Sequence, residues 1–68
     1  MKLGKYKHFK GNEYQLIHIG IHSETLEEYA VYKKMYDDYS VWVRPLAMFN
    51  EIIEHEGRKV KRFEAISE

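Results

Sequence analysis

Cysteine is absent from the 68 residues, which excludes disulfides and thiolate metal sites. A chain of this length forms one domain, residues 1–68, and buries only about 60% of the surface that its unfolded form exposes. Its core must therefore come from six tyrosines, three phenylalanines, one tryptophan and the aliphatic residues, or be supported by dimerisation. Aromatic rings suit this task because each buries roughly 150–250 Å².

Long hydrophobic runs are also lacking. No segment approaches the roughly 20 consecutive apolar residues of a membrane-spanning helix. The opening residues Met1–His8 contain no apolar stretch of signal-peptide length. We therefore expect a cytoplasmic protein of bacterial type that does not act at a membrane.

Neither sign of charge predominates, because the formal net charge is zero. The charges are nevertheless unevenly placed, since residues 13–57 are mainly acidic and both ends of the chain are basic. If the first and last strands are neighbours, the domain has a basic edge that could follow a phosphate backbone. The candidate phosphate contacts are Lys5, Lys7, Lys10, Lys59, Lys61 and Arg62.

Short alternating segments separated by turn residues run along the whole chain, which predicts an all-β fold. Turns are expected at 10–12, 23–25, 37–38 and 56–57, and one helical turn at Pro45–Phe49 because proline favours a first helical position. Five to six short strands with this spacing predict a small SH3-like barrel. The expected strands are Leu3–Phe9, Tyr14–His22, 29–36, Val41–Arg44, Glu51–His55 and Arg58–Phe63.

Alternation also predicts which faces are buried. In the second strand, Ile17, Ile19 and Ile21 share one face, which we expect to be core. In the fourth strand Val41 and Val43 are expected to be core, and Trp42 and Arg44 are expected to lie on the opposite surface. A helix across Thr25–Tyr36 is the competing interpretation, but the segment lacks a 3.6-residue apolar period.

Three motifs stand in a fixed order along the chain: His22-Ser-Glu-Thr25, Trp42-Val-Arg-Pro45 and Met48-Phe49. With Tyr6-x-His8 before them and Gly57 after them, they cover nearly the whole sequence. On these motifs the chain resembles a small bacterial domain-of-unknown-function family, numbered sixteen fifty-three. The resemblance implies an SH3-like β barrel and implies no activity, so it transfers no functional residues.

No enzymatic, metal or cofactor site is predicted. His18 and His22 are roughly 13 Å apart along one strand, which is too far for one ion. His22, Ser23 and Glu24 include the residue types of a hydrolytic triad, but neighbours in a strand face opposite ways and no nucleophile elbow is present. A small hydrolase built around His22 and Glu24 is therefore the weaker alternative.

The favoured hypothesis is a non-enzymatic binding or adaptor module that contacts a protein partner or a second copy of itself. An arginine beside a tryptophan can stack on a ring or donate to a carboxylate. The alternative interpretation of these aromatic residues is structural, with Arg44 paired to an acidic loop. A nucleic-acid-binding module that uses the basic ends is the second functional hypothesis. The candidate binding residues are His22, Glu24, Tyr32, Tyr36, Trp42 and Arg44.

Overall fold

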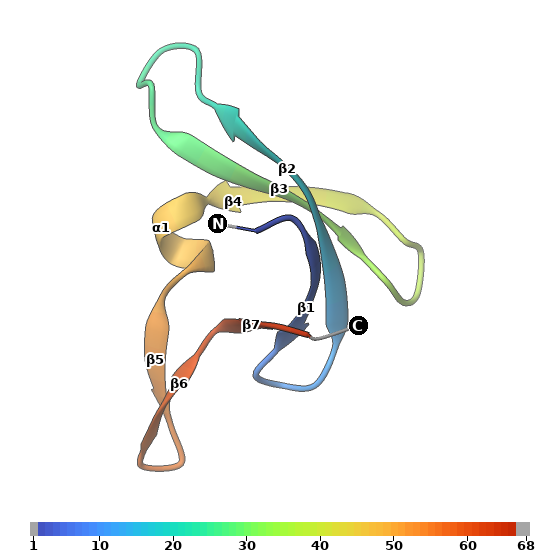
Figure 1. Ribbon diagram of the computed structural model, residues 1–68, viewed down its shortest axis with the longest axis vertical. Coiled ribbons are helices and arrows are strands. Elements are labelled where there is room, and N and C mark those ends of the chain that lie inside the picture. Colours follow the sequence, from blue (N-terminus) through green and yellow to red (C-terminus); the bar gives the residue numbers. More distant parts are fainter. Residues whose placement is uncertain (1, 67–68) are drawn as a thin grey trace.

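Antiparallel strands that follow one another along the chain form most of this protein (Figure 1). The computed structural model describes residues 2–66. The prediction of a small all-β domain with one helical turn is confirmed. The elements are β1 (Gly4–His8), β2 (Glu13–Ile21), β3 (Glu28–Lys34), β4 (Val41–Pro45), α1 (Leu46–Phe49), β5 (Ile52–His55), β6 (Arg58–Lys61) and β7 (Phe63–Ala65).

The main sheet has the strand order β4-β3-β2-β1-β7. Strands β1 to β4 form a meander, and the chain then passes through α1 before β7 returns to pair with β1. This order, with a short helix before the last strand, is that of an SH3-like barrel. Strands β5 and β6 form a separate hairpin that projects away from the main sheet (Figure 1). The first and last strands of the sequence are therefore neighbours, which is the condition that the basic edge requires.

One turn and one break between strands show how local chemistry defines the strand ends. Glu56 and Gly57 have φ of 52° and 75°, the pair of positive values that a two-residue type I′ hairpin requires. The segment predicted as one strand, Arg58–Phe63, is instead divided between β6 and β7. Arg62 lies where the chain changes partners, because its backbone N–H donates to the Glu51 carbonyl of the hairpin at 2.9 Å, while its own carbonyl accepts from the Phe9 N–H beside β1 at 3.0 Å. Its guanidinium also donates to the Glu51 carboxylate at 2.6 Å.

Aromatic rings form the core. Phe49 of α1 and Phe63 of β7 are stacked, with ring centroids 4.1 Å apart. Tyr6 and Tyr32 contact Phe49 with centroids at 5.3 and 5.4 Å, so a four-residue helix joins both halves of the bent sheet. The buried residues are Tyr6, Leu16, Ala30, Tyr32, Phe49 and Phe63.

The prediction that the isoleucine face of β2 is core was wrong. Ile17 and Ile21 are 42% and 66% exposed, whereas Leu16 is 1% exposed. Ile17 faces outward because of a β-bulge, where the pairing of β2 with β3 shifts register between Leu16 and His18. An extra residue in one strand reverses the inward and outward positions that follow it. Leu16 and Ile19 thereby lie on the same face. Ile21 lies on the same face as Ile19 but is exposed because it ends the strand, opposite Glu28.

The predicted faces of β4 were also reversed. Val41 and Val43 are 57% and 63% exposed. Trp42 and Arg44 lie opposite the buried Tyr32 and Ala30 of β3, so they extend from the inner face of the sheet. Within residues 2–66, β4 pairs with β3 alone and is an edge strand, so no second layer covers its valines.

Candidate functional site

A cavity of about 260 Å³ lies on the inner face of β3 and β4, next to the aromatic core. Four of the predicted binding residues, Tyr32, Tyr36, Trp42 and Arg44, meet in its wall. Tyr32 and Trp42 are directly opposite each other across the β3–β4 pair, which explains why residues ten apart in sequence converge. We call this site the aromatic pocket; its lining is Tyr14, Tyr32, Lys34, Tyr36, Trp42 and Arg44.

Hydrogen bonding and ring packing fix the tyrosines of the aromatic pocket. The hydroxyl oxygens of Tyr14 and Tyr36 are 2.7 Å apart and share one hydrogen bond. The Tyr14 ring meets the rings of Tyr36 and Tyr32 edge-on, at centroid distances of 5.6 and 5.5 Å. Burial, followed by the hydrogen bond to Tyr36, raises the pKa of Tyr14 to about 12. This hydroxyl therefore remains neutral at physiological pH.

Lys34 contributes a cation whose charge is already compensated. Its Nζ lies 3.5 Å from a carboxylate oxygen of Asp37 and 3.5 Å from one of Asp38. The same Nζ lies 4.8 Å from the centre of the Tyr36 ring. Lys34 thus fixes the β3–β4 turn to the pocket wall and adds little free charge.

Arg44 is different, because no carboxylate of residues 2–66 lies within ion-pair distance of its guanidinium. Its Nε donates one long hydrogen bond, 3.4 Å, to the Tyr32 hydroxyl. The guanidinium carbon lies 5.8 Å from the centre of the Phe63 ring. A guanidinium has five N–H donors, so most of them remain available for a ligand.

Trp42 forms the rim of the aromatic pocket. Its indole Nε1 donates a 2.6 Å hydrogen bond to the Ser40 hydroxyl, and the residue is 52% exposed. The ring is therefore held in one orientation while half of it faces solvent. An exposed, oriented indole beside a free guanidinium is a surface that can contact another molecule with little reorganisation.

The remaining two candidate binding residues, His22 and Glu24, lie in the β2–β3 turn and do not line the aromatic pocket. His22 Nδ1 accepts hydrogen bonds from the backbone N–H groups of Glu24 and Thr25 at 3.2 and 3.3 Å. These contacts stabilise the turn. An imidazole that accepts at Nδ1 carries its proton on Nε2 when neutral, which is the opposite of the tautomer that a triad base requires, so nothing in this geometry favours the hydrolase alternative.

Sequence reasoning missed Tyr14 and Lys34 as pocket residues. They are directly opposite each other across the β2–β3 pair. Lys34 was detectable, because Tyr32, Lys34 and Tyr36 alternate along one strand face. Tyr14 was not, because its face was assigned from the isoleucine alternation that the bulge interrupts.

A second cavity, of about 290 Å³, separates β1 from the β5–β6 hairpin. Among the candidate phosphate contacts, Lys7 and Lys61 line it, whereas Arg62 is bound to Glu51. The rings of Phe9 and His55 meet across it with centroids 5.0 Å apart. We call this site the basic cavity; its lining is Lys7, His8, Phe9, His55, Val60, Lys61 and Glu64.

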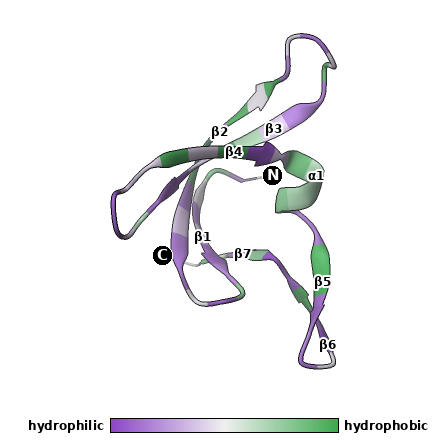
Figure 2. Ribbon diagram, turned by 180° about the vertical axis from the view of Figure 1, so that it is seen from behind, coloured by the Kyte–Doolittle hydropathy of each residue, from purple (hydrophilic) through white to green (hydrophobic). Residues whose placement is uncertain are grey.

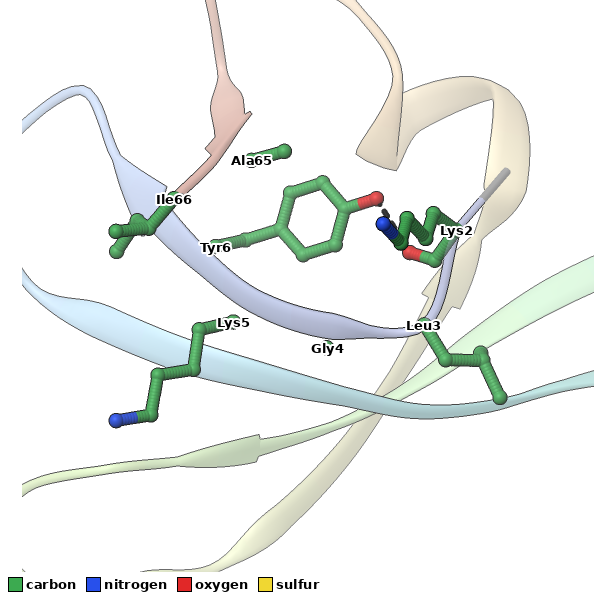
Figure 3. A pocket seen from close by; sticks show the side chains of 7 residues that line it. All are labelled: Lys2, Leu3, Gly4, Lys5, Tyr6, Ala65 and Ile66. Carbon is green, nitrogen blue, oxygen red and sulfur yellow. Dashed lines mark hydrogen bonds between the residues drawn. The ribbon is translucent and has the colours of Figure 1, made fainter. Parts of the chain in front are cut away.

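A third cavity, of about 470 Å³, lies beside the start of β1 and the end of β7 (Figure 3). The Tyr6 hydroxyl points toward Lys2 and donates to its backbone oxygen at 2.6 Å. Lys5 points away from the Tyr6 ring (Figure 3). The side-chain hydroxyl of this wall is therefore already bonded, and the other polar side chains that line it are those of Lys2 and Lys5.

Residues 2–66 contain neither a cluster of metal-binding side chains nor a membrane-spanning helix. No group of three or more His, Cys, Asp or Glu side chains is arranged to hold a metal ion. Within the same residues, no helix has the length and apolar character needed to cross a membrane.

Residues 4–65 match the family described as "Protein of unknown function (DUF1653)". The chain belongs to the DUF1653 family. A similar solved structure is the crystal structure of a DUF1653 protein from Bordetella bronchiseptica, with a TM-score of 0.89 and 26% sequence identity. That match covers 97% of this chain and 87% of the other. No curated protein matches the chain. The resemblance noted from the motifs is thus confirmed, and the family carries no assigned activity.

Proposed function

We propose that this DUF1653 domain is a non-enzymatic module that recognises a protein partner through the aromatic pocket. The observation that carries the proposal is the unpaired guanidinium of Arg44 beside the half-exposed indole of Trp42. Arginine and tryptophan are two of the residues most enriched among those that dominate binding energy at protein interfaces. A pocket that combines them suits a partner side chain with an acidic or aromatic end.

The fixed orientation of the side chains in the aromatic pocket supports this proposal. Binding is weakened by the entropy lost when interface side chains become fixed, about 0.5–1.5 kcal/mol for each flexible one. Trp42 is already held by Ser40, and Tyr36 is already held by Tyr14. These side chains therefore lose little freedom when a partner binds.

The test is selection of a displayed random peptide library against the purified domain, followed by binding measurements with Trp42→Ala. We expect selected peptides to shift the Trp42 indole resonance and to lose most of their affinity for this variant. Tyr39→Ala is the matched control, because Tyr39 is 51% exposed but does not line the aromatic pocket. Trp42→Ala should stay folded, since half of the side chain is in solvent. The proposal fails if no peptide is enriched, or if Trp42→Ala binds as wild type does.

A second candidate function is single-stranded nucleic acid binding at the basic cavity. The observation in its favour is that Lys7 and Lys61 flank the rings of Phe9 and His55, since such sites combine cations with stacking surfaces. The affinity for a short labelled RNA should then fall steeply with salt. In a plot of the logarithm of the binding constant against the logarithm of the salt concentration, Lys61→Ala should reduce the magnitude of the slope by about one. Lys33→Ala is the control, because Lys33 lies outside the basic cavity. A signal that does not depend on salt would eliminate this candidate.

A further inference from the structure

The outer edge of β4 has unused hydrogen-bonding groups. The Lys34 N–H donates to the Ser40 carbonyl at 2.9 Å, so this facing pair belongs to the hydrogen-bonded set of the β3–β4 ladder. Bonded and non-bonded pairs alternate in an antiparallel ladder. The backbone groups of Val41 and Val43 therefore point away from β3. Within residues 2–66 we find no hydrogen bond to them, which leaves two N–H and two C=O groups facing outward.

The Val41–Val43 part of this edge lacks the usual protection against strand pairing. Open edges are commonly blocked by lysine, by an inward-pointing charge or by a bulge. Strand β4 has neither a lysine nor a bulge, and its inward-pointing charge, Arg44, and its proline both stand after the valines, at the end of the strand. Most of β4 is green or pale in Figure 2, and the strand becomes purple only near its end. Val41, Trp42 and Val43 are all more than half exposed.

We propose that β4 accepts an extended segment of the partner protein as an additional antiparallel strand, with an acidic side chain of that segment bound to Arg44. This inference rests on the proposed function and adds its binding mode and the chemistry of the partner. Strand addition obtains affinity from main-chain hydrogen bonds and specificity from alternate side chains. Val41 and Val43 supply the hydrogen bonds, and the aromatic pocket receives the side chains on the inner face.

The register of the added strand defines a sequence pattern. An antiparallel segment meets Arg44 first and Val41 last. Its first residue faces the guanidinium and is acidic, and its third residue lies beside the indole of Trp42 and is large and apolar. Its second and fourth residues lie beside Val43 and Val41 on the outer face and are β-branched. The partner segment thus reads acidic, β-branched, large apolar, β-branched.

Charge complementarity favours this occupant over a second copy of the chain. Two copies of β4 that use all four outward groups must pair symmetrically about Trp42. That register places Arg44 opposite Ser40 of the other copy, so no carboxylate stands directly across from either guanidinium, and the nearby Asp37 and Asp38 are already paired with Lys34. An acidic segment neutralises Arg44 directly, with charge-assisted hydrogen bonds.

The first experiment uses a capped peptide of sequence SGEVLVGS and the complete domain labelled for amide NMR. We expect saturable binding, with shifts at Val41 and Val43 and at the aromatic pocket, and slower amide exchange at both valines. N-methylation of both peptide valine amides should abolish binding, because these amides face β4. N-methylation of the leucine amide is the matched control and should leave binding intact, because that amide faces solvent.

The second experiment tests the acidic residue by charge exchange. Arg44→Glu should weaken binding of SGEVLVGS at least tenfold and should create binding of the peptide SGKVLVGS. Arg58→Glu makes the same change in the β5–β6 hairpin and should affect neither peptide. Arg44→Gln supplies the measurement if the reversed charge unfolds the domain, and it should weaken SGEVLVGS and leave SGKVLVGS unbound.

The outcomes separate this inference from the proposed function. If peptides bind the aromatic pocket but methylation of the valine amides has no effect, strand addition is refuted and the proposed function stands. If slow exchange at Val41 and Val43 develops with protein concentration alone, the occupant is a second copy and the inference is overturned. If neither this peptide nor the selected library binds, both proposals fail.

Discussion

Replacing Phe49 by alanine should remove most of the stability of this domain. Phe49 is 0% exposed, stacks on Phe63 and contacts the rings of Tyr6 and Tyr32. Truncating a buried phenylalanine to alanine costs about 3–5 kcal/mol. At about 0.05–0.15 kcal/mol per residue, a domain of this size has a total free energy of unfolding of roughly 3–10 kcal/mol. A single substitution in the four-residue helix is therefore expected to leave the domain marginally stable or unfolded.

Urea denaturation followed by the fluorescence of Trp42, the single tryptophan, measures this effect. Met48→Ala is the matched control, because Met48 precedes Phe49 in the same helix and is 45% exposed. We expect it to cost about 1 kcal/mol or less. If Phe49→Ala is unfolded without urea, Phe49→Leu gives a measurable midpoint with an unchanged slope. Costs for Phe49→Ala and Met48→Ala within 1 kcal/mol of each other would refute the assignment of Phe49 as the residue that joins the two halves of the sheet.

Three further predictions concern single groups. Tyr14 should titrate in ultraviolet absorbance with a pKa of about 12, so the stability it contributes is full below pH 10 and is lost as the pH rises to about 12. Tyr14→Phe should remove that loss, and a pKa of 10.0 would contradict both the burial of Tyr14 and its hydrogen bond to Tyr36. The pKa of His8 is lowered below 6.5 by partial burial and then by the charge of Arg62, so its contribution to stability is full above pH 6.5 and decreases as the pH falls. His8→Gln should flatten the thermal denaturation midpoint over that range, and an unchanged pH profile would exclude this role. Gly57→Ala should cost about 1 kcal/mol in urea denaturation, because Gly57 has φ of 75°, and an unchanged midpoint would argue against the type I′ turn.

The order of strands and turns was predictable from sequence because each strand carries its own local signal. Gly57 marks a turn through its backbone freedom, and Pro45 ends a strand because it has no N–H for the next ladder position. These signals depend on residues next to each other in the chain. They specify where elements begin and end, and the structure agrees with them to within a few residues.

The direction in which side chains point was not predictable, because it depends on pairing with other strands. One extra residue near Ile17 reverses the inward and outward positions of the residues that follow it in β2. Val43 has the alternation of a buried position, yet no second layer covers it within the described residues. Four pocket residues were found because aromatic and charged side chains alternate in β3 and β4. Tyr14 was missed because its place in the pocket depends on the β2–β3 register.

The pairing of β7 with β1, between the two ends of the sequence, has a consequence for how the chain folds. A folding chain can form the meander of β1 to β4 before β7 docks, and at that stage the five-residue β1 presents an open edge to other chains. When β7 docks, it replaces that edge by one of only three residues, and very short edges are poor templates for aggregation. Pairing between segments so far apart in sequence is slow to form. The interval before β7 docks is therefore when this side of the sheet is most open to pairing with other chains.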